Sequence, residues 1–183
     1  MEELASEWEE YIIPEDQVNQ FALTAFLPLA LIVVLPFWLI HGGGATGQGF
    51  MWIIKHPLRL IGLMVVGTLI HEGLHALGWV LFARISFKEM KFGILKGNPY
   101  THVKVPLPAR AYQLGTALPG IMLGVVPGLI SWVNSNGVLM LFGAIMLTAA
   151  AGDAIMLWLL REVPPDRMVK DHPSAIGCLV KKE

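Results

Sequence analysis

Two histidines and a glutamate lie close together in one apolar stretch of the chain, in the order His71-Glu72-Gly73-Leu74-His75. On a helix, residues four apart lie on one face, so His71 and His75 can present two imidazoles to one metal ion. Glu72 follows the first histidine and is close enough to act on a metal-bound water. This H-E-x-x-H pattern predicts a metal-dependent hydrolase.

The setting of the motif strengthens this interpretation, because residues 61–82 are almost wholly apolar. Ionisable groups inside a membrane cost several kcal/mol unless they have partners, so they are candidates for function by default. The alternative is structural: two hydrogen-bonded histidines that pack between helices, beside a protonated Glu72.

The composition indicates a polytopic membrane protein. Hydrophobic residues make up 55% of the chain and charged residues only 15%, with a mean hydropathy of +0.60, whereas soluble domains carry about a quarter charged residues. The net charge of −1 argues against a nucleic-acid partner. The single cysteine, Cys178, excludes a disulfide within the chain.

Four stretches are long and apolar enough to cross a bilayer, which takes about 20 residues in a helix. They are residues 21–40, 58–82, 112–133 and 138–160. We therefore expect an all-α membrane domain over residues 21–160, between an acidic segment at 1–20 and a tail at 161–183.

A β-hairpin is expected over residues 85–105, on the cytoplasmic side of the membrane between the second and third spans. Residues 85–94 are rich in strand formers, residues 100–105 alternate, and Lys96-Gly97-Asn98-Pro99 between them is typical of a turn. Its edge either pairs with an extended substrate peptide or belongs to an ordinary connection.

Glycines mark two further places. The glycine-rich run at residues 41–49 predicts a flexible loop outside the membrane. Gly120, Gly124 and Gly128 are spaced four apart, which favours close helix packing, although a hinge is an alternative. Pro119 and Pro127 are expected to bend this helix.

Lys and Arg residues predict the orientation in the membrane. All of them except Lys55 and Arg59 lie on the side of the two termini, so both termini are expected in the cytoplasm. The first twenty residues lack Lys and Arg, which argues against a signal peptide. Leu4, Trp8 and Tyr11 suit a short amphipathic helix at the membrane surface, and a solvated acidic tail is the alternative.

Asp153 is the expected third metal ligand, because it is the only ionisable residue in the fourth span. His75 and Asp153 each lie seven residues before the cytoplasmic end of their spans, or about 10 Å at 1.5 Å per residue. Matching depth lets them meet, and two imidazoles with one carboxylate leave a fourth zinc position for water. Asp153 could instead be a lone hydrogen-bonding residue between helices.

Other candidate ligands are less well placed. His41 and His56 fall on the opposite side of the membrane, and His102 lies on the expected hairpin. His172 and Cys178 lie in the C-terminal tail, which either forms turns or folds back over the cytoplasmic mouth.

These features together resemble the site-2 protease clan of intramembrane zinc metalloproteases. The chain is more closely similar to a small bacterial and archaeal family of "putative zincin peptidases", over about residues 58–178. The residues that carry this likeness are His71 to His75, Pro106-Leu107-Pro108, Leu118-Pro119-Gly120, Gly152-Asp153 and Asp171-His172-Pro173-Ser174. The resemblance implies that His71, His75 and Asp153 bind zinc and that Glu72 is the catalytic base. Site-2 proteases usually present Leu-Asp-Gly where this chain has Gly152-Asp153-Ala154.

The sequence thus predicts a multi-pass cell-membrane endopeptidase with one Zn²⁺ per chain that acts on a membrane protein or peptide in or near the lipid bilayer. A second hypothesis is a non-proteolytic scaffold that holds a partner's transmembrane helix, with a structural or vestigial metal site. A metal-ion transporter is less well supported, since the far halves of the spans hold almost no acidic or histidine residues.

Overall fold

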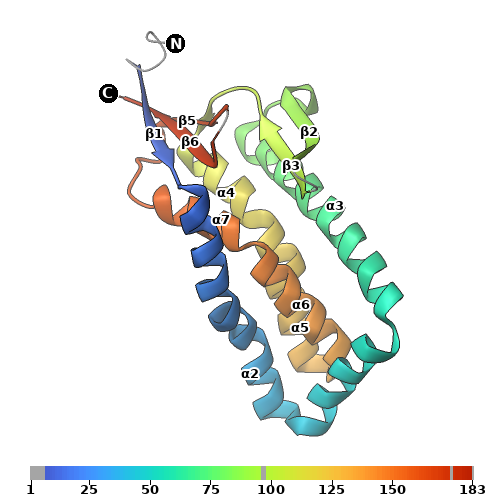
Figure 1. Cartoon of the computed structure of the whole chain (residues 1–183). Helices are drawn as coiled ribbons and strands as arrows, with labels where there is room; N and C mark the ends of the chain where they lie inside the picture. Colours follow the sequence, from blue (N-terminus) through green and yellow to red (C-terminus); the bar gives the residue numbers. More distant parts are fainter. Residues whose placement is uncertain (1–6, 96–97, 174, 183) are drawn as a thin grey trace. The chain divides into compact units, whose positions relative to one another are not determined.

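The computed structural model of the protein describes residues 7–95, 98–173 and 175–182 (Figure 1). Leu4, Lys96, Gly97 and Ser174, which entered the predictions above, lie outside the described residues. The described chain is mostly helical and carries two small β-sheets. Two compact units make it up. The first unit comprises residues 1–19, 72–118 and 153–183, and the second comprises residues 20–71 and 119–152.

The first long helix, α2, runs from Glu15 to Lys55 and is broken at Gly42, where φ is 74° and ψ is 177°. The expected flexible loop at residues 41–49 is therefore wrong, because the chain resumes a helix directly after this break. Glycine serves close packing here rather than flexibility: a Cβ atom on Gly49 would collide with the backbone of Gly137 in the second unit.

The remaining helices are α3 (Pro57–Ala83), α4 (Ala109–Pro119), α5 (Val126–Asn134), α6 (Gly137–Ala149) and α7 (Ala151–Leu159). A π-helical stretch, Gly120–Val125, joins α4 to α5, between the two prolines that were expected to bend this helix.

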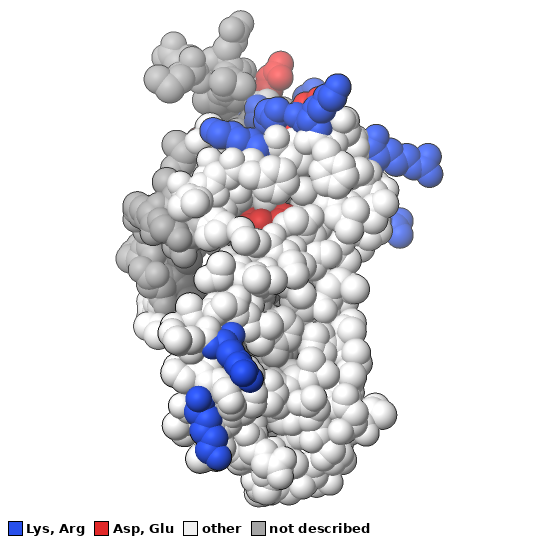
Figure 2. Space-filling view, turned by 90° about the vertical axis from the view of Figure 1, so that its right-hand side faces the viewer, with Lys and Arg blue, Asp and Glu red and all other residues white. Residues whose placement is uncertain are grey.

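Among the described residues, three helices are long and apolar enough to cross a membrane, namely Leu23–Lys55, Pro57–Ala83 and Ala109–Asn134. The pair α6 and α7, bent by 45°, makes up to four. The long helices expose large apolar side chains, including Leu23, Phe26, Leu27, Leu58, Ile61, Val65 and Leu69. Most of the face shown in Figure 2 carries no Lys, Arg, Asp or Glu. Such surfaces are consistent with a membrane protein.

Small residues bring the helices of the second unit together. A Cβ atom on Gly124 would lie 2.8 Å from the Cβ atom of Leu147, and one on Gly128 would lie 3.1 Å from Val33. The Trp132 indole also donates a hydrogen bond to the Val33 carbonyl at 3.0 Å. These contacts confirm the close packing that the glycine spacing predicted.

The hairpin consists of β2 (Met90–Leu95) and β3 (Asn98–Val103), which pair antiparallel with Met90 opposite Val103. A hairpin therefore lies inside the predicted range of residues 85–105. The side of the membrane on which it lies stays a prediction.

The second sheet of the first unit has the strand order β1-β6-β5-β4, formed by Trp8–Ile12, Gly177–Lys181, Met168–Asp171 and Leu107–Pro108. This corrects the all-α prediction and both interpretations of the N-terminal segment, because residues 8–12 form a strand against β6. In the tail, bends at Pro173, Ala175 and Ile176 lie between β5 and β6, so the expected turns are accompanied by two strands that the sequence did not predict. Pairing between strands so distant in sequence leaves little local pattern.

Apolar residues from this sheet and from the helices form the core of the first unit. Its buried members include Trp79, Leu107, Tyr112, Leu160 and Cys178. Cys178 is fully enclosed, and this burial raises the pKa of its thiol to about 12.

The buried thiol gives a direct test of the sheet. A thiolate is the reactive form, so we expect Cys178 in the native protein to react with an alkylating reagent at least about a hundredfold more slowly than an exposed cysteine at about pH 8. A Ser86→Cys, Cys178→Ser variant provides the exposed control, and denatured wild type should label fully. Equal native rates for the two cysteines would contradict the buried strand.

Candidate metal centre

Helix α3 carries both histidines of the motif on its buried face. His71 and His75 are 8% and 7% exposed, whereas Leu69 and Ile70 just before them are 59% and 47% exposed. An i, i+4 spacing in a continuous helix therefore turns two imidazoles inward while apolar side chains face outward. This is the arrangement that the sequence predicted for the two residues.

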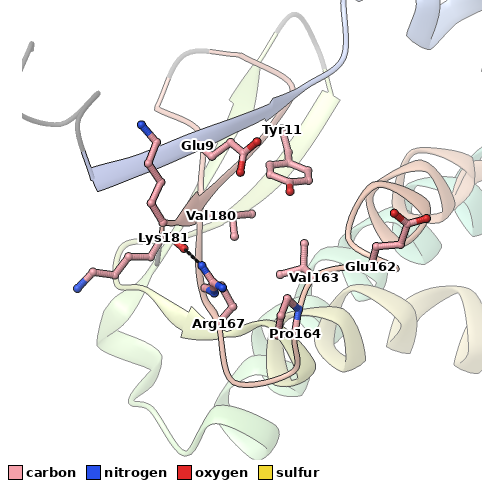
Figure 3. Close-up of a pocket in the computed structure, with 9 residues that line it drawn as sticks. Glu9, Tyr11, Glu162, Val163, Pro164, Arg167, Val180 and Lys181 are labelled. Carbon is pink, nitrogen blue, oxygen red and sulfur yellow. Dashed lines mark hydrogen bonds between the residues drawn. The ribbon is translucent and has the colours of Figure 1, made fainter.

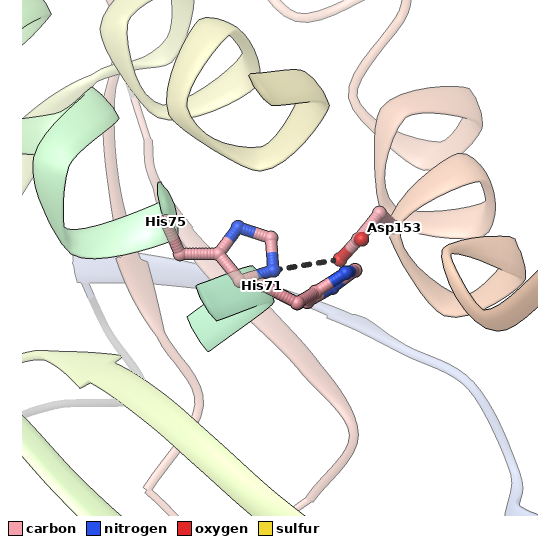
Figure 4. Close-up of side chains that lie close together, drawn as sticks. All are labelled: His71, His75 and Asp153. Atoms are coloured by element: carbon pink, nitrogen blue, oxygen red, sulfur yellow. Dashed lines mark ion pairs between the residues drawn. The ribbon is translucent and has the colours of Figure 1, made fainter. Parts of the chain in front are cut away.

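Asp153 approaches the histidines from the first turn of α7, directly after the bend between α6 and α7. Its Oδ1 atom lies 3.3 Å from Nε2 of His75 (Figure 4). His71, His75 and Asp153 each offer one ligand atom, and these atoms lie within 4.8 Å of one another. The three residues can therefore hold a metal ion.

The donor set fits zinc. Ligand atoms of a tetrahedral zinc ion lie about 3.4 Å apart when each is about 2.1 Å from the metal. His75 and Asp153 already stand at 3.3 Å. Two imidazoles with one carboxylate also leave a fourth position open, as in catalytic rather than structural zinc sites.

Helix α4 orients His75 by contacting the ring nitrogen that faces away from Asp153. The Nδ1 atom of His75 lies 3.2 Å from the Gly115 carbonyl, so a proton on Nδ1 can be donated there while Nε2 points to Asp153. The Trp79 ring stacks on the His75 ring with centroids 5.5 Å apart. A Cβ atom on Gly115 would collide with the Trp79 indole, so only glycine permits this approach.

Glu72 is half-buried and follows His71 on α3. Its position around the helix axis differs from that of His75 by about 60° at 3.6 residues per turn. The Glu72 backbone carbonyl accepts a hydrogen bond from the Thr101 hydroxyl at 3.0 Å. Strand β3 of the hairpin therefore lies beside the residue that the sequence predicted as the base.

The other histidines have partners elsewhere. Nε2 of His41 lies 2.8 Å from the Trp132 carbonyl, and Nδ1 of His56 lies 3.0 Å from the Trp52 carbonyl. His102 lies 3.5 Å from the carboxylate of Asp171, and His172 lies 3.9 Å from that of Glu10.

Sequence reasoning missed the residues that support His75, namely Gly115 and Trp79. A glycine in a helix is the only local signal for the first, and the second resembles any core tryptophan. It also missed the role of Asp171, whose carboxylate accepts hydrogen bonds from Tyr112 and Val103. Burial raises the pKa of the Asp171 carboxyl, while these hydrogen bonds and His102 act to lower it.

A separate hollow of about 290 Å³ lies beside the four-stranded sheet (Figure 3). Tyr11, Val163, Arg167 and Val180 are among its lining residues, and the Arg167 guanidinium donates a hydrogen bond to the Lys181 carbonyl. None of the three candidate metal ligands lines it.

Long apolar helices, two buried histidines and a partly buried aspartate are the features expected of a helical membrane protein with a metal-binding site. The profile of a family described as "Putative zincin peptidase" matches residues 64–168, and the chain belongs to this family. Family membership and the His, His and Asp group together support a metallopeptidase.

The chain is also similar to a protein of Pyrococcus woesei called an uncharacterized 24.7 kDa protein in the gap 5′ region. The two are 30% identical over 124 residues, which cover 65% of this chain and 53% of that protein. The chain thus spans about half the length of this curated relative. No solved structure matches the chain.

Metal content tests two of the three ligands, His75 and Asp153. We expect one zinc per chain in the purified wild type, and its loss or at least about tenfold weaker binding in His75→Ala and Asp153→Ala, because each removes a direct ligand. His56→Ala and His172→Ala serve as controls that keep the metal. Zinc that survives in both ligand variants, measured by elemental analysis, would contradict this site.

The close approach of α4 to α3 gives a second test. Gly115→Ala forces the Trp79 ring away from its place against His75, so we expect weaker zinc binding by about tenfold or more, as for other residues that orient a ligand. Gly73→Ala is the matched control, because a Cβ atom there meets nothing within 4 Å. A titration with a fluorescent zinc chelator separates the two. Equal affinities would show that α4 does not orient His75.

Proposed function

We propose that the protein is a zinc-dependent integral membrane endopeptidase that hydrolyses peptide bonds in or near the bilayer. His71, His75 and Asp153 hold the metal, and Glu72 is the catalytic base. The observation that carries the proposal is the gathering of three ligand atoms within 4.8 Å, two from the buried histidines of α3 and one from the partly buried Asp153 of α7. Membership of the zincin peptidase family supports the same conclusion.

The metal and the protein side chains supply different parts of the reaction. Zinc, when bound, lowers the pKa of water and polarises a carbonyl oxygen. Glu72 takes the proton from the attacking water and passes it to the departing amine. Asp153 places a negative charge beside the two imidazoles, which offsets part of the metal's charge in surroundings of low dielectric. The Gly115 carbonyl holds the His75 ring in its ligating orientation.

The substrate in this proposal is an extended segment of a membrane protein or peptide. The Thr101 hydroxyl of β3 donates a hydrogen bond to the Glu72 carbonyl. A substrate strand that pairs with this hairpin would therefore pass close to the base. The hairpin also offers exposed apolar side chains, since Phe92 is 56% and Ile94 is 75% exposed. These suit a substrate that is itself apolar.

The surrounding lipid bilayer and the orientation belong to the proposal. By the predicted spans nearly all Lys and Arg residues lie on the side of the termini, which supports an orientation with both termini in the cytoplasm. Water then reaches the metal from that side. The resemblance to the site-2 protease clan that the sequence suggests would fit such a site within the membrane.

The base assignment has a clean test. Glu72→Gln keeps the shape of the side chain but cannot take a proton, so we expect one zinc per chain and a loss of turnover of about a thousandfold or more. Cleavage of a fluorescently labelled casein by zinc-loaded protein in detergent measures it. Glu162→Gln, at an exposed glutamate outside the site, is the control.

The possible results separate three interpretations. Undiminished cleavage by Glu72→Gln would remove Glu72 from the mechanism. Zinc-bearing wild type without activity on any peptide would favour the scaffold hypothesis, with a structural metal. Zinc transport by proteoliposomes containing the protein would favour the transporter.

A further inference from the structure

A buried carboxylate outside the metal centre joins three parts of the first unit. Asp171, the last residue of β5, has a side chain that is only 14% exposed. Its Oδ2 atom accepts the Val103 N–H at 2.7 Å and its Oδ1 atom accepts the Tyr112 hydroxyl at 2.5 Å. Nδ1 of His102 lies 3.5 Å from the same carboxylate. The family match ends at residue 168, before this aspartate.

The first set of contacts made by Asp171 connects it to the hairpin through Val103. The Val103 N–H donates to Asp171 and therefore points away from β2. The carboxylate thus binds the edge of β3 that does not pair with β2. Thr101 lies two residues earlier, so its side chain shares a face of β3 with that of Val103. Val103 is buried in the core, and Thr101 donates its hydroxyl to the Glu72 carbonyl.

The second set of contacts connects Asp171 to the metal ligand through α4. The Tyr112 ring stacks on Trp79 with centroids 5.5 Å apart, and the Tyr112 carbonyl accepts the Trp79 indole N–H at 3.1 Å. Trp79 in turn stacks on His75. Gly115, one turn after Tyr112 on α4, offers its carbonyl to His75. One carboxylate thus fixes two elements that each contact α3 inside the His71 to His75 motif.

We propose that Asp171 is a positioning residue, whose carboxylate anchors β3 beside Glu72 and α4 beside His75. The C-terminal sheet then sets the separation between the hairpin edge, where a substrate strand lies, and the reacting groups. Its catalytic consequence rests on the proposed peptidase function, but the anchoring of β3 and α4 does not. Asp171 touches neither substrate nor metal, and it acts through Val103 and Tyr112.

Amide hydrogen exchange reads this anchor directly, because the Val103 N–H donates to Asp171. In zinc-loaded full-length protein, we expect Asp171→Ala to speed exchange at Val103 by at least about tenfold, since a lost partner exposes the amide to solvent. Zinc content should stay at one per chain. Asp166→Asn, at an exposed aspartate on the preceding loop, is the matched control and should leave exchange unchanged.

A conservative variant separates anchoring from a general loss of structure. In Asp171→Asn, the amide oxygen can accept the Val103 N–H while the NH₂ group donates to the Tyr112 hydroxyl. We therefore expect exchange at Val103 to return to within about threefold of the wild type, because the hydrogen bond is restored. Tyr112→Phe removes one of the two hydrogen bonds without a large cavity and keeps the test available if Asp171→Ala does not fold.

Kinetics on labelled casein complete the test. Loss of the anchor should raise KM by about tenfold and change kcat less, because the hairpin edge moves while the metal ligands remain. Val103 exchange within about twofold of wild type in both Asp171→Ala and Tyr112→Phe would overturn the proposal, and so would loss of zinc together with rapid labelling of Cys178 in both variants. If wild type cleaves no peptide, the proposed function fails, while the exchange result still decides the role of Asp171.

Discussion

The structure depends on one constraint, which is that polar ligands must be held among apolar helices. Two imidazoles and a carboxylate are costly in such surroundings unless each is satisfied by a neighbour. His75 illustrates the solution, because Asp153 lies 3.3 Å from one ring nitrogen and the Gly115 carbonyl 3.2 Å from the other. Both partners come from elements far away in sequence, so the helices that carry them must approach closely. The glycine at position 115 follows from this need, because a Cβ atom there would collide with the Trp79 indole.

A series of contacts supports the site, beginning at His75 on α3 and leading to Asp171. The Trp79 ring stacks between those of His75 and Tyr112, and the Tyr112 hydroxyl donates a hydrogen bond to Asp171. The contacts differ in kind. The rings of His75 and Trp79 stack, the Trp79 indole donates to the Tyr112 carbonyl, and the Asp171 carboxylate accepts hydrogen bonds from Tyr112 and Val103. An aromatic ring cannot adjust to a shift of its neighbours as a flexible side chain can, which makes this stack a rigid connection. The geometry around His75 is therefore set by strands that lie outside the helices.

The sequence predicted the parts of the molecule whose signals are local. Apolar stretches longer than a membrane is thick, an i, i+4 pair of histidines and a strand-turn-strand pattern are all readable within a few residues, and the structure has the corresponding helices, histidine pair and hairpin. Asp153 was singled out because a lone ionisable residue stands out in an apolar span, and the structure brings it to 3.3 Å from His75. The four-stranded sheet was missed since its strands are short and pair across most of the chain. The run at residues 41–49 was misjudged because glycine serves flexible loops and tight helix contacts equally well.

The pairing of β1 with β6 has a consequence for how the protein is made. Trp8 lies opposite Lys181, so the first strand leaves the ribosome long before its partner exists. Helices can insert and pack as they emerge, whereas contacts between such distant segments form late. The sheet that carries Asp171 therefore closes only after α7 has been synthesised. A site whose geometry needs this sheet is therefore complete only once β6 has been made.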